Sequence, residues 1–305
     1  MHAHAREVLD MVAIKKMLCL AATSAAVIGA SGTATAQSDL SDDCPNPIRM
    51  ADTGVEGMGP LKEAFGPFSE VFEEHTGLEL EMYSLSNRTA AGNALQYDDV
   101  ELVFAGPSEF VLFQREGDVE ILFDIQRPHY GSSFYVPADS EIESLEDLEG
   151  KRVALKDTGS TSGHIIPSQM LVEAGLDLDR DLEITMAGDA RISALVNGDV
   201  DAMGGGNRDI EEIREMDPDG EYRVIAESDP LPGDPVVIRG NLPEACKTGL
   251  RETLKENRDE LWEALVETDR NEDKFLNRDS HMGFELTAED YEVIEEAYEA
   301  AGIEL

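Results

Sequence analysis

Three consecutive hydroxyl side chains give this sequence its clearest chemical signal. Ser160, Thr161 and Ser162 stand in the stretch TGSTSGHIIP, between a strand-like segment and an apolar, helix-like one. Hydroxyl groups at the start of a helix can donate hydrogen bonds to an anion, and the positive end of the helix dipole assists them. The alternative is an ordinary Ser/Thr cap followed by a turn, which uses the same residue types.

Pro167 indicates where this helix begins. Proline has no N–H group and fits best in the first turn, so the helix starts only a few residues earlier. Backbone N–H groups from Ser162 to Ile165 then lack partners within the helix and point back along its axis. Together with the hydroxyls they predict a cradle for a tetrahedral oxyanion.

Patterns for covalent or metal chemistry are absent from the sequence. The six histidines do not form an H-E-x-x-H motif, and neither a G-x-S-x-G elbow nor a Cys-x-x-Cys pair occurs. No nucleophile with a neighbouring base can be recognised. We therefore expect a binding protein without a metal or other cofactor. A hydrolytic enzyme is an alternative, which a turnover assay on phosphonate or phosphate esters would test.

Composition and charge limit the partners. The 305 residues, 41 % hydrophobic and 29 % charged, are typical of a soluble globular protein with one large or two medium domains. The net charge of -41 repels nucleic acid and anionic lipid, and the acidic residues are spread along the chain as a solubilising surface. The electrostatic potential at any site for an anion must therefore be locally positive, against the negative charge of the whole protein.

Residues 1–36 read as a secretory signal peptide. Two lysines precede an apolar run at 17–29 that is too short to span a bilayer, and Ala-Thr-Ala at 34–36 provides a cleavage site. The alternative is a membrane anchor or a buried helix, and Met11 is an alternative start. We expect a periplasmic product. Export permits a disulfide between Cys44 and Cys246, with two unpaired thiols as the alternative.

Strand-like and helix-like stretches alternate along most of the chain, which predicts parallel sheets with helices on their faces. Turn residues stand beside a β-rich stretch near 128–137 and again near 230–240. These two places suggest crossings of the chain between two lobes. The end of the chain is helical over 244–268, and Thr287 with Asp290 resembles a capping box before a last helix. The strand candidates are 78–85, 100–106, 120–125, 132–136, 151–155, 182–188, 222–227 and 235–239. The helix candidates between them are 60–75, 107–115, 164–174, 189–197 and 207–216.

Several segments of the sequence resemble those of one known family. The segment IESLEDLEGKRVALKDTGSTSGHIIPSQMLVEAGLD resembles the phosphate/phosphite/phosphonate ABC-transporter substrate-binding proteins, in which a similar segment runs into a Ser-Thr-Ser-Gly loop and a helix. The resemblance continues in DARISALVNGDVDAM, ESDPLPGDPVVIR and VELVFAGPSEFV, and loosely in residues 60–83. It covers roughly residues 48–300.

The resemblance implies an α/β fold of the two-lobed periplasmic binding protein type (type II-like), with two hinge crossovers. Lobe I would comprise residues 37–131 and 238–305, and lobe II residues 132–237. The expected function is binding of a phosphonate, phosphite or phosphate for delivery to an ABC permease in the inner membrane. An alternative is an oxyanion-sensing protein that feeds a membrane sensor kinase. We expect a monomer in either case.

The resemblance also implies roles for cleft residues. It makes Ser160, Thr161 and Ser162 the oxyanion clamp, and it places Asp234 in the cleft as a carboxylate that can hold a ligand amine. The alternative for Asp234 is a turn aspartate between two prolines. Tyr130, at the first hinge beside His129, is expected to reach the cleft.

His164 follows the clamp directly in the sequence. It either faces the ligand or lies on the first turn of the helix.

Several positions depart from the family pattern. Arg88 falls where a cleft tyrosine is usual, and Arg208 where aminophosphonate binders have an acid. Ala105 replaces a second aromatic residue, and Gly188 replaces a histidine. Because arginine binds oxyanions bidentately, we expect a ligand more negative than aminoethylphosphonate or a small inorganic oxyanion. The alternative is that both arginines lie on the surface.

Overall fold

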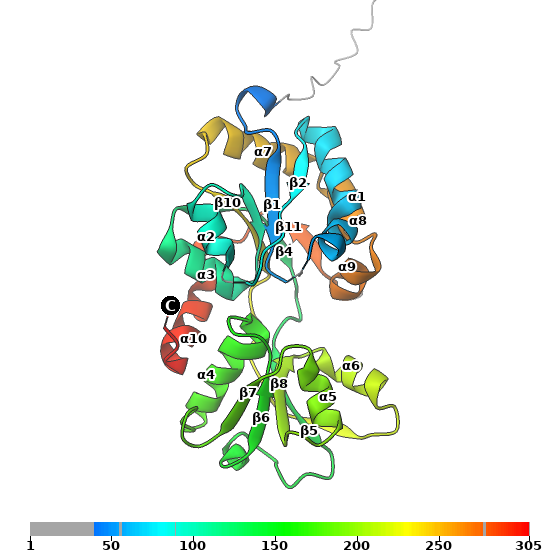
Figure 1. Cartoon of the computed structure of the whole chain (residues 1–305), viewed down its shortest axis with the longest axis vertical. Coiled ribbons are helices and arrows are strands. Elements are labelled where there is room, and N and C mark those ends of the chain that lie inside the picture. Colours follow the sequence, from blue (N-terminus) through cyan, green and yellow to red (C-terminus); the bar gives the residue numbers. More distant parts are fainter. Residues whose placement is uncertain (1–39, 55–56, 89, 277–278, 305) are drawn as a thin grey trace, which may run out of the picture. The chain divides into compact units, whose positions relative to one another are not determined.

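The computed structural model describes residues 40–54, 57–88, 90–276 and 279–304. The expected signal peptide lies outside these residues and stays a prediction. Within the described ranges, none of the helices has the length and apolarity needed to cross a lipid bilayer. The fold consists of two lobes, each built on one β-sheet with helices on both faces (Figure 1).

The first lobe contains a six-stranded sheet in the order β11-β4-β10-β3-β1-β2. Its strands are β1 Ile48–Asp52, β2 Leu80–Met82, β3 Leu102–Phe104, β4 Val119–Gln126, β10 Asp234–Arg239 and β11 His281–Gly283. Its helices are α1 Met58–Thr76, α2 Ala90–Gln96, α3 Pro107–Glu116, α7 Glu244–Glu256, α8 Arg258–Leu265, α9 Asp269–Lys274 and α10 Glu292–Ala301.

The second lobe contains a five-stranded sheet in the order β7-β6-β8-β5-β9. Its strands are β5 Ser132–Pro137, β6 Arg152–Leu155, β7 Glu183–Met186, β8 Ala202–Gly206 and β9 Tyr222–Glu227. Its helices are α4 Ile166–Glu173, α5 Ala190–Val196 and α6 Asp209–Met216. Single turns at Leu40–Asp42, Glu146–Leu148, Thr161–Ile165 and Ala288–Tyr291 complete the described structure.

Both sheets are mixed, which corrects the expectation of parallel sheets. Pairs β1–β2, β1–β3, β6–β7 and β6–β8 are parallel, whereas β10 is antiparallel to both β3 and β4, and β5 to both β8 and β9. Strand β11 is antiparallel to β4 as well, and each of these antiparallel pairs contains a strand next to a crossing. The chain passes from β4 to β5 and from β9 back to β10, and these strands continue between lobes instead of returning through a helix.

Between the two crossings the chain forms the five-stranded sheet, so the second lobe is inserted into the sequence of the first. The division at 131/132 and 237/238 stays a prediction in its details. Residues 234–237, expected in lobe II, pair with β3 and β4 in the six-stranded sheet.

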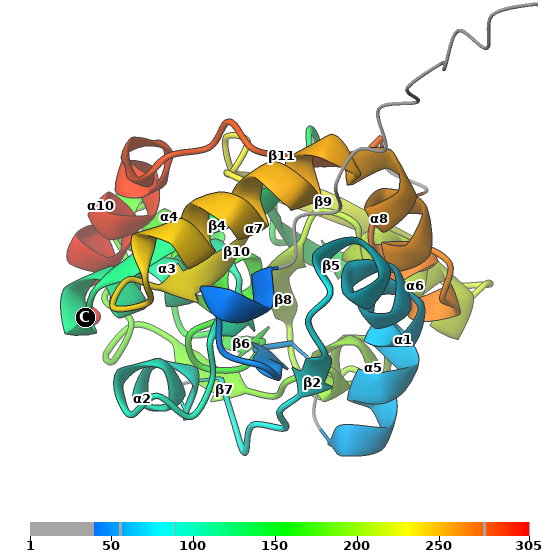
Figure 2. The ribbon, with the colours of Figure 1, turned by 90° about the horizontal axis from the view of Figure 1, so that it is seen from above.

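Alternation along the strands of the first lobe builds a core on each face of its sheet. Met50 packs in a cluster with α1, α7 and α8, while its neighbour Ala51 packs in a second cluster with α2, α3 and α10. Figure 2 shows α1 and α8 on one side and α2, α3 and α10 on the other. In the second lobe, Phe134 packs toward α4 and Tyr135 toward α5 and α6.

Two local predictions are confirmed. Cys44 and Cys246 form a disulfide that joins the start of the described chain to α7. Thr287 and Asp290 form a capping box ahead of α10. Because α10 packs against both α3 and α4, this end of the chain touches helices of both lobes.

Candidate functional site

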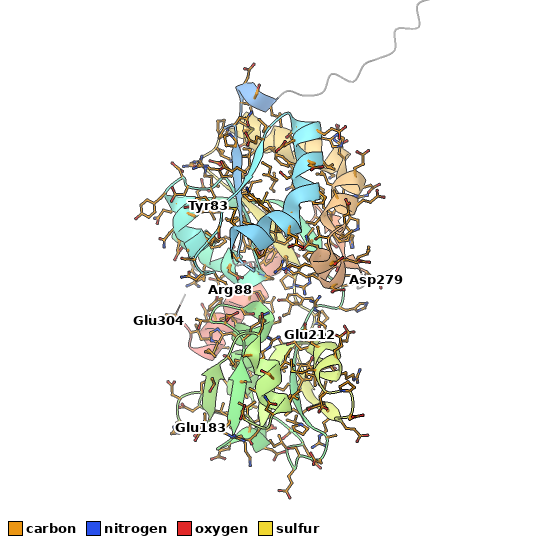
Figure 3. The ribbon with its side chains drawn as sticks, turned by 45° about the vertical axis from the view of Figure 1, so that its right-hand side comes forward. Tyr83, Arg88, Glu183, Glu212, Asp279 and Glu304 are labelled. Atoms are coloured by element: carbon orange, nitrogen blue, oxygen red, sulfur yellow. A yellow bond between two sulfur atoms is a disulfide. The ribbon has the colours of Figure 1, made fainter. Side chains whose placement is uncertain are left out.

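A cavity of about 260 Å³ is lined by residues from both lobes. Its lining contains seven of the chain's 24 lysines and arginines but only seven of its 65 acidic residues. The cavity is therefore balanced in charge within a strongly acidic protein. The basic residues are Arg88, Arg127, Lys156, Arg191, Arg208, Arg270 and Lys274. In Figure 3, Arg88 lies on the side of the first lobe that faces the second, and Glu212 lies on the facing side.

The serine-rich loop connects β6 to α4 through one wide, π-helical turn at Thr161–Ile165. The N–H of Lys156 donates to the carbonyl of Gly163 at 2.8 Å, which folds the loop back onto the end of β6. A Cβ atom at position 163 would lie 2.4 Å from the Cβ of Lys156, so this approach requires glycine. The fold thereby brings Ser160, Thr161 and Ser162 to the cavity wall.

The backbone of this turn differs from the expectation. The N–H groups of His164 and Ile165 both donate to the carbonyl of Ser160, at 2.9 and 3.0 Å. The prediction that amides from Ser162 to Ile165 point freely toward the ligand is therefore wrong for these two. The wide turn closes on its own carbonyl, and a sequence pattern for an α-helical start does not reveal this.

The three hydroxyls of the loop have different surroundings. Ser160 and Thr161 are buried. The Thr161 hydroxyl accepts the N–H of Ser108 at 3.0 Å and lies 2.8 Å from the Ser108 hydroxyl, at the start of α3 in the other lobe. Ser162 lines the cavity and is only partly buried. Thr161 is thus occupied by a contact between lobes, and Ser160 and Ser162 are the better placed for a ligand.

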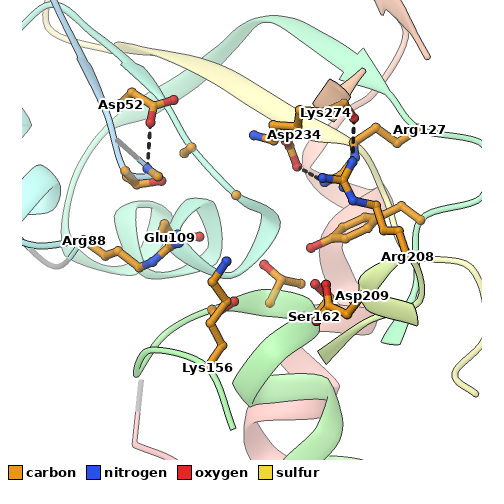
Figure 4. Close-up of a pocket in the computed structure, with 18 of the residues that line it drawn as sticks. Asp52, Arg88, Glu109, Arg127, Lys156, Ser162, Arg208, Asp209, Asp234 and Lys274 are labelled. Atoms are coloured by element: carbon orange, nitrogen blue, oxygen red, sulfur yellow. Dashed lines mark hydrogen bonds and ion pairs between the residues drawn. The ribbon is translucent and has the colours of Figure 1, made fainter. Parts of the chain in front are cut away.

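Asp234 lies in the cavity with both of its oxygens paired. Its Oδ1 is 2.9 Å from Nη1 of Arg127, and its Oδ2 is 3.0 Å from Nζ of Lys274 (Figure 4). Burial opposes the charge of Asp234, but the two cations outweigh it and hold its pKa below the ordinary value. Burial lowers the pKa of Lys274, and the nearby Asp234 only partly offsets this.

The two predicted arginines both line the cavity. Arg88 pairs with Glu109 at 2.8 Å. Burial works against its charge, but Glu109 more than compensates and raises the pKa of Arg88. Arg208 donates from Nη1 to the carbonyl of Lys274 at 2.8 Å, which ties α6 to the end of α9. Neither arginine is on the outer surface, and each has a protein partner.

Tyr130 and His164 have different positions. Tyr130 is buried, lines the cavity and lies under the Arg127 guanidinium, whose central carbon is 3.7 Å from the ring centroid. Burial is the main cause that raises the pKa of Tyr130, so its hydroxyl stays protonated as a donor. His164 does not line the cavity. Its Nδ1 accepts the N–H of Gly159 at 3.1 Å, and His164 therefore supports the loop from behind.

Sequence reasoning missed several cavity residues. Lys156 stands four residues before the first loop serine and points into the cavity in Figure 4, so its place in KDTGSTSG was an available signal. Arg127 immediately precedes the first crossing, which is a second available signal. Arg191 is paired with Asp209 at 2.5 Å. Arg270 and Lys274 come from α9, a short helix whose sequence, DRNEDK, has no ligand-binding pattern.

Gly188 and the triple glycine have structural roles. Gly188 has φ of 56°, a left-handed conformation that favours glycine over histidine. The glycines 204–206 belong to β8, and a Cβ at Gly205 would lie 2.0 Å from Oδ2 of Asp209. Among the described residues, no group of three or more His, Cys, Asp or Glu side chains is arranged to hold a metal ion.

A two-lobed α/β fold with a polar, cation-containing cavity between its lobes is the architecture of the periplasmic binding proteins. A family model described as an ABC transporter, phosphonate, periplasmic substrate-binding protein matches residues 58–291. The chain belongs to this family, whose members are substrate-binding components of transporters.

Two curated relatives agree with this placement. The chain is 29 % identical over 188 residues to the phosphate-import protein PhnD of Mycolicibacterium smegmatis, covering 56 % of this chain and 59 % of that protein. It is 26 % identical over 205 residues to the phosphonates-binding periplasmic protein of Escherichia coli, covering 63 % and 61 %. The matched part thus spans about three fifths of the length of these relatives.

Solved structures show the same fold. PhnD1 from Prochlorococcus marinus, in complex with methylphosphonate, has a TM-score of 0.68 at 18 % identity and covers 86 % of this chain and 100 % of that one. The aliphatic sulphonate binding protein SsuA of Escherichia coli has a TM-score of 0.58 at 18 % identity, covering 86 % and 95 %. At these identities the likeness concerns the fold alone.

Proposed function

We propose that this protein binds one small phosphorus oxyanion (a phosphonate, phosphite or phosphate) in the cavity between its lobes. The observation that carries the proposal is the set of donors there: seven of the chain's 24 basic side chains, with the hydroxyls of Ser160 and Ser162, line about 260 Å³. Hydrogen bonds from charged donors to an oxyanion are stronger than neutral ones, and burial strengthens them further.

The relatives support phosphorus over sulfur as the central atom. One is named as a phosphate importer and the other as a phosphonate binder, and the matching family is a phosphonate family. Delivery to an ABC permease in the inner membrane follows from membership of a transporter family. Feeding a sensor kinase is the alternative, and a permease and an ATPase encoded beside the gene would argue against it.

Closure of the lobes is the proposed mechanism. A ligand that contacts Ser162 from one lobe and Arg88 or Lys274 from the other binds the closed arrangement more tightly than an open one. The ligand therefore shifts the equilibrium between arrangements without any covalent step.

A thermal-shift panel tests the proposal. The ligands are phosphate, phosphite, methylphosphonate, aminoethylphosphonate, arsenate, arsenite and sulfate, in moderate salt. We expect at least one phosphorus oxyanion to raise the melting temperature at micromolar to millimolar concentration, because a ligand of the native state stabilises it by mass action. If no phosphorus compound does so, or only sulfate does, the proposed function is wrong.

A further inference from the structure

A carboxylate whose two oxygens are both occupied lies at one end of the cavity. Asp234 is only 3 % exposed, and Arg127 and Lys274 each pair with one of its oxygens, at 2.9 and 3.0 Å. The three residues come from separate segments: the start of β10, the residue after β4, and the end of α9. Each oxygen of Asp234 therefore already has a cationic partner, and a cationic group of a ligand would have to share that oxygen with it.

Aromatic rings hold the two cations in position. The Arg127 guanidinium lies 3.7 Å from the centroid of the Tyr130 ring. The Lys274 ammonium lies 4.6 Å from the centroid of Phe275 and 5.4 Å from that of Phe104. Such contacts attract a cation to the face of a ring. The arrangement is thus built by the protein and needs no ligand to form.

The cluster favours an added anion over an added cation. Asp234 supplies one negative charge to two cations, and Asp52 is the further carboxylate whose charge acts on Lys274. Burial still lowers the pKa of Lys274. A ligand oxyanion beside Lys274 would supply a second partner, whereas an ammonium group would be a third cation in the same buried space.

Two other cavity carboxylates are occupied in the same way. Glu109 pairs with Arg88 at 2.8 Å, and Asp209 with Arg191 at 2.5 Å. Asp189 also lines the cavity and pairs with Lys156 at 3.2 Å and with Arg191 at 3.3 Å. Burial raises the pKa of Asp52 and of Glu212, which favours their neutral forms and makes them weaker partners for a ligand amine.

We propose, resting on the proposed oxyanion-binding function, that Arg127 and Lys274 determine ligand specificity. They select phosphorus oxyanions without a cationic substituent and disfavour aminoalkylphosphonates. Asp234 then serves to position the two cations and does not receive a ligand amine, which reverses the role expected from the family resemblance.

The test compares two ligands of the same size. Propylphosphonate and 2-aminoethylphosphonate differ by a methyl group in place of an ammonium group. Isothermal titration calorimetry on the wild-type protein should give at least a roughly tenfold preference for propylphosphonate. Lys274→Met frees one oxygen of Asp234. We expect the ratio of the two Kd values to shift by about tenfold or more in favour of 2-aminoethylphosphonate. Lys255→Met, on the exposed face of α7, is the matched control and should leave the ratio unchanged.

The Asp234→Asn variant provides an independent test of the role of Asp234. If Asp234 only positions cations, this variant keeps the preference for propylphosphonate. If Asp234 receives the amine, the variant loses affinity for 2-aminoethylphosphonate selectively, and the inference is overturned. Equal binding of both ligands by the wild-type protein, or an unchanged ratio in folded Lys274→Met, also overturns it. These outcomes differ from failure of the proposed function, in which the wild-type protein binds neither ligand nor phosphate or phosphite.

Discussion

The hydroxyls of Ser108 and Thr161 lie 2.8 Å apart although the two residues belong to different lobes. Ser108 is the second residue of α3, and its N–H also donates to the Thr161 hydroxyl at 3.0 Å. Its hydroxyl lies 2.5 Å from the carbonyl of Gly159. These contacts join the serine-rich loop to the six-stranded lobe beside the cavity, so the loop depends on both lobes for its position.

Thr161→Val should therefore destabilise the protein by about 1–3 kcal/mol, because it leaves the buried N–H of Ser108 without its acceptor. Ser108→Ala should have an effect of similar size. The double variant should cost less than the sum of the two, with a coupling of about 1 kcal/mol, when measured by urea unfolding. Strict additivity would contradict a direct interaction between these side chains.

Ser162→Ala should weaken ligand binding without a comparable loss of stability. One hydrogen bond to a charged oxygen contributes about 1.5–3 kcal/mol, which corresponds to roughly a 10- to 150-fold rise in Kd. Titration calorimetry with the best phosphorus ligand from the panel would measure this. Ser193→Ala removes a hydroxyl that only bonds the carbonyl of Ala190 and should leave Kd unchanged. An equal effect of both variants would exclude a ligand contact at Ser162.

The Arg88–Glu109 pair predicts opposite effects of two substitutions. Arg88→Ala removes a cation and leaves Glu109 facing the cavity, so affinity for an oxyanion should fall by about tenfold or more. Glu109→Gln keeps the shape and releases Arg88 from its ion pair, so affinity should rise severalfold. Calorimetry at one fixed ionic strength checks both. A loss of affinity in both variants would show that the pair serves only the structure.

His164 predicts a pH dependence of stability. Burial holds its pKa in the folded protein below the ordinary value, and its Nδ1 must stay unprotonated to accept the N–H of Gly159. The folded protein thus binds fewer protons than the unfolded chain. The contribution of neutral His164 to the free energy of unfolding is complete above a pH of about 6.5. It is lost as the pH falls from there toward the lower pKa of His164 in the folded protein.

Urea unfolding at several pH values from 5 to 7 tests this, with His164→Phe as the variant. The variant should show a flatter pH profile than the wild-type protein over this range. His281→Phe, which changes an exposed histidine, is the control. Parallel profiles for the wild-type protein and His164→Phe would contradict the assignment.

The disulfide predicts an effect on stability that is separate from binding. Cys44 and Cys246 are 202 positions apart, and neither lines the cavity. The variant with both changed to serine should lose about 2–5 kcal/mol of unfolding free energy while its ligand Kd stays the same. Reductant should lower the stability of the wild-type protein and have no effect on the variant. A matching loss of affinity would link this bond to the cavity.

Hydrophobic alternation made most of the fold predictable. The eight strand candidates all correspond to strands, because each has a run of alternating or continuous apolar residues. Three of the described strands, β1, β8 and β11, were missed. Strand β8 ends in Gly204 to Gly206, a sequence that reads as a turn. Its glycines are explained only by tertiary packing against Asp209 and Leu155, which no local pattern contains.

The cavity was predictable only where a contiguous motif supplied it. Ser160, Thr161 and Ser162 are adjacent in sequence, and the family pattern draws attention to Asp234, Arg88 and Arg208. Lys274 and Arg270 reach the cavity because α9 is folded back against it from far along the chain. The pairing of Asp234 with two cations could not be foreseen, since it joins three segments that no sequence spacing connects.

The balance of charge in the cavity has a consequence for how fast a ligand arrives. With a net charge of -41 around a lining that is itself neutral overall, an approaching anion is repelled until it is inside the lobes. Salt shortens the range of this repulsion to about 10 Å at 0.1 M. The association rate should therefore increase with ionic strength, opposite to the usual steering of ligands by charge, while the dissociation rate is governed by the buried contacts and changes little.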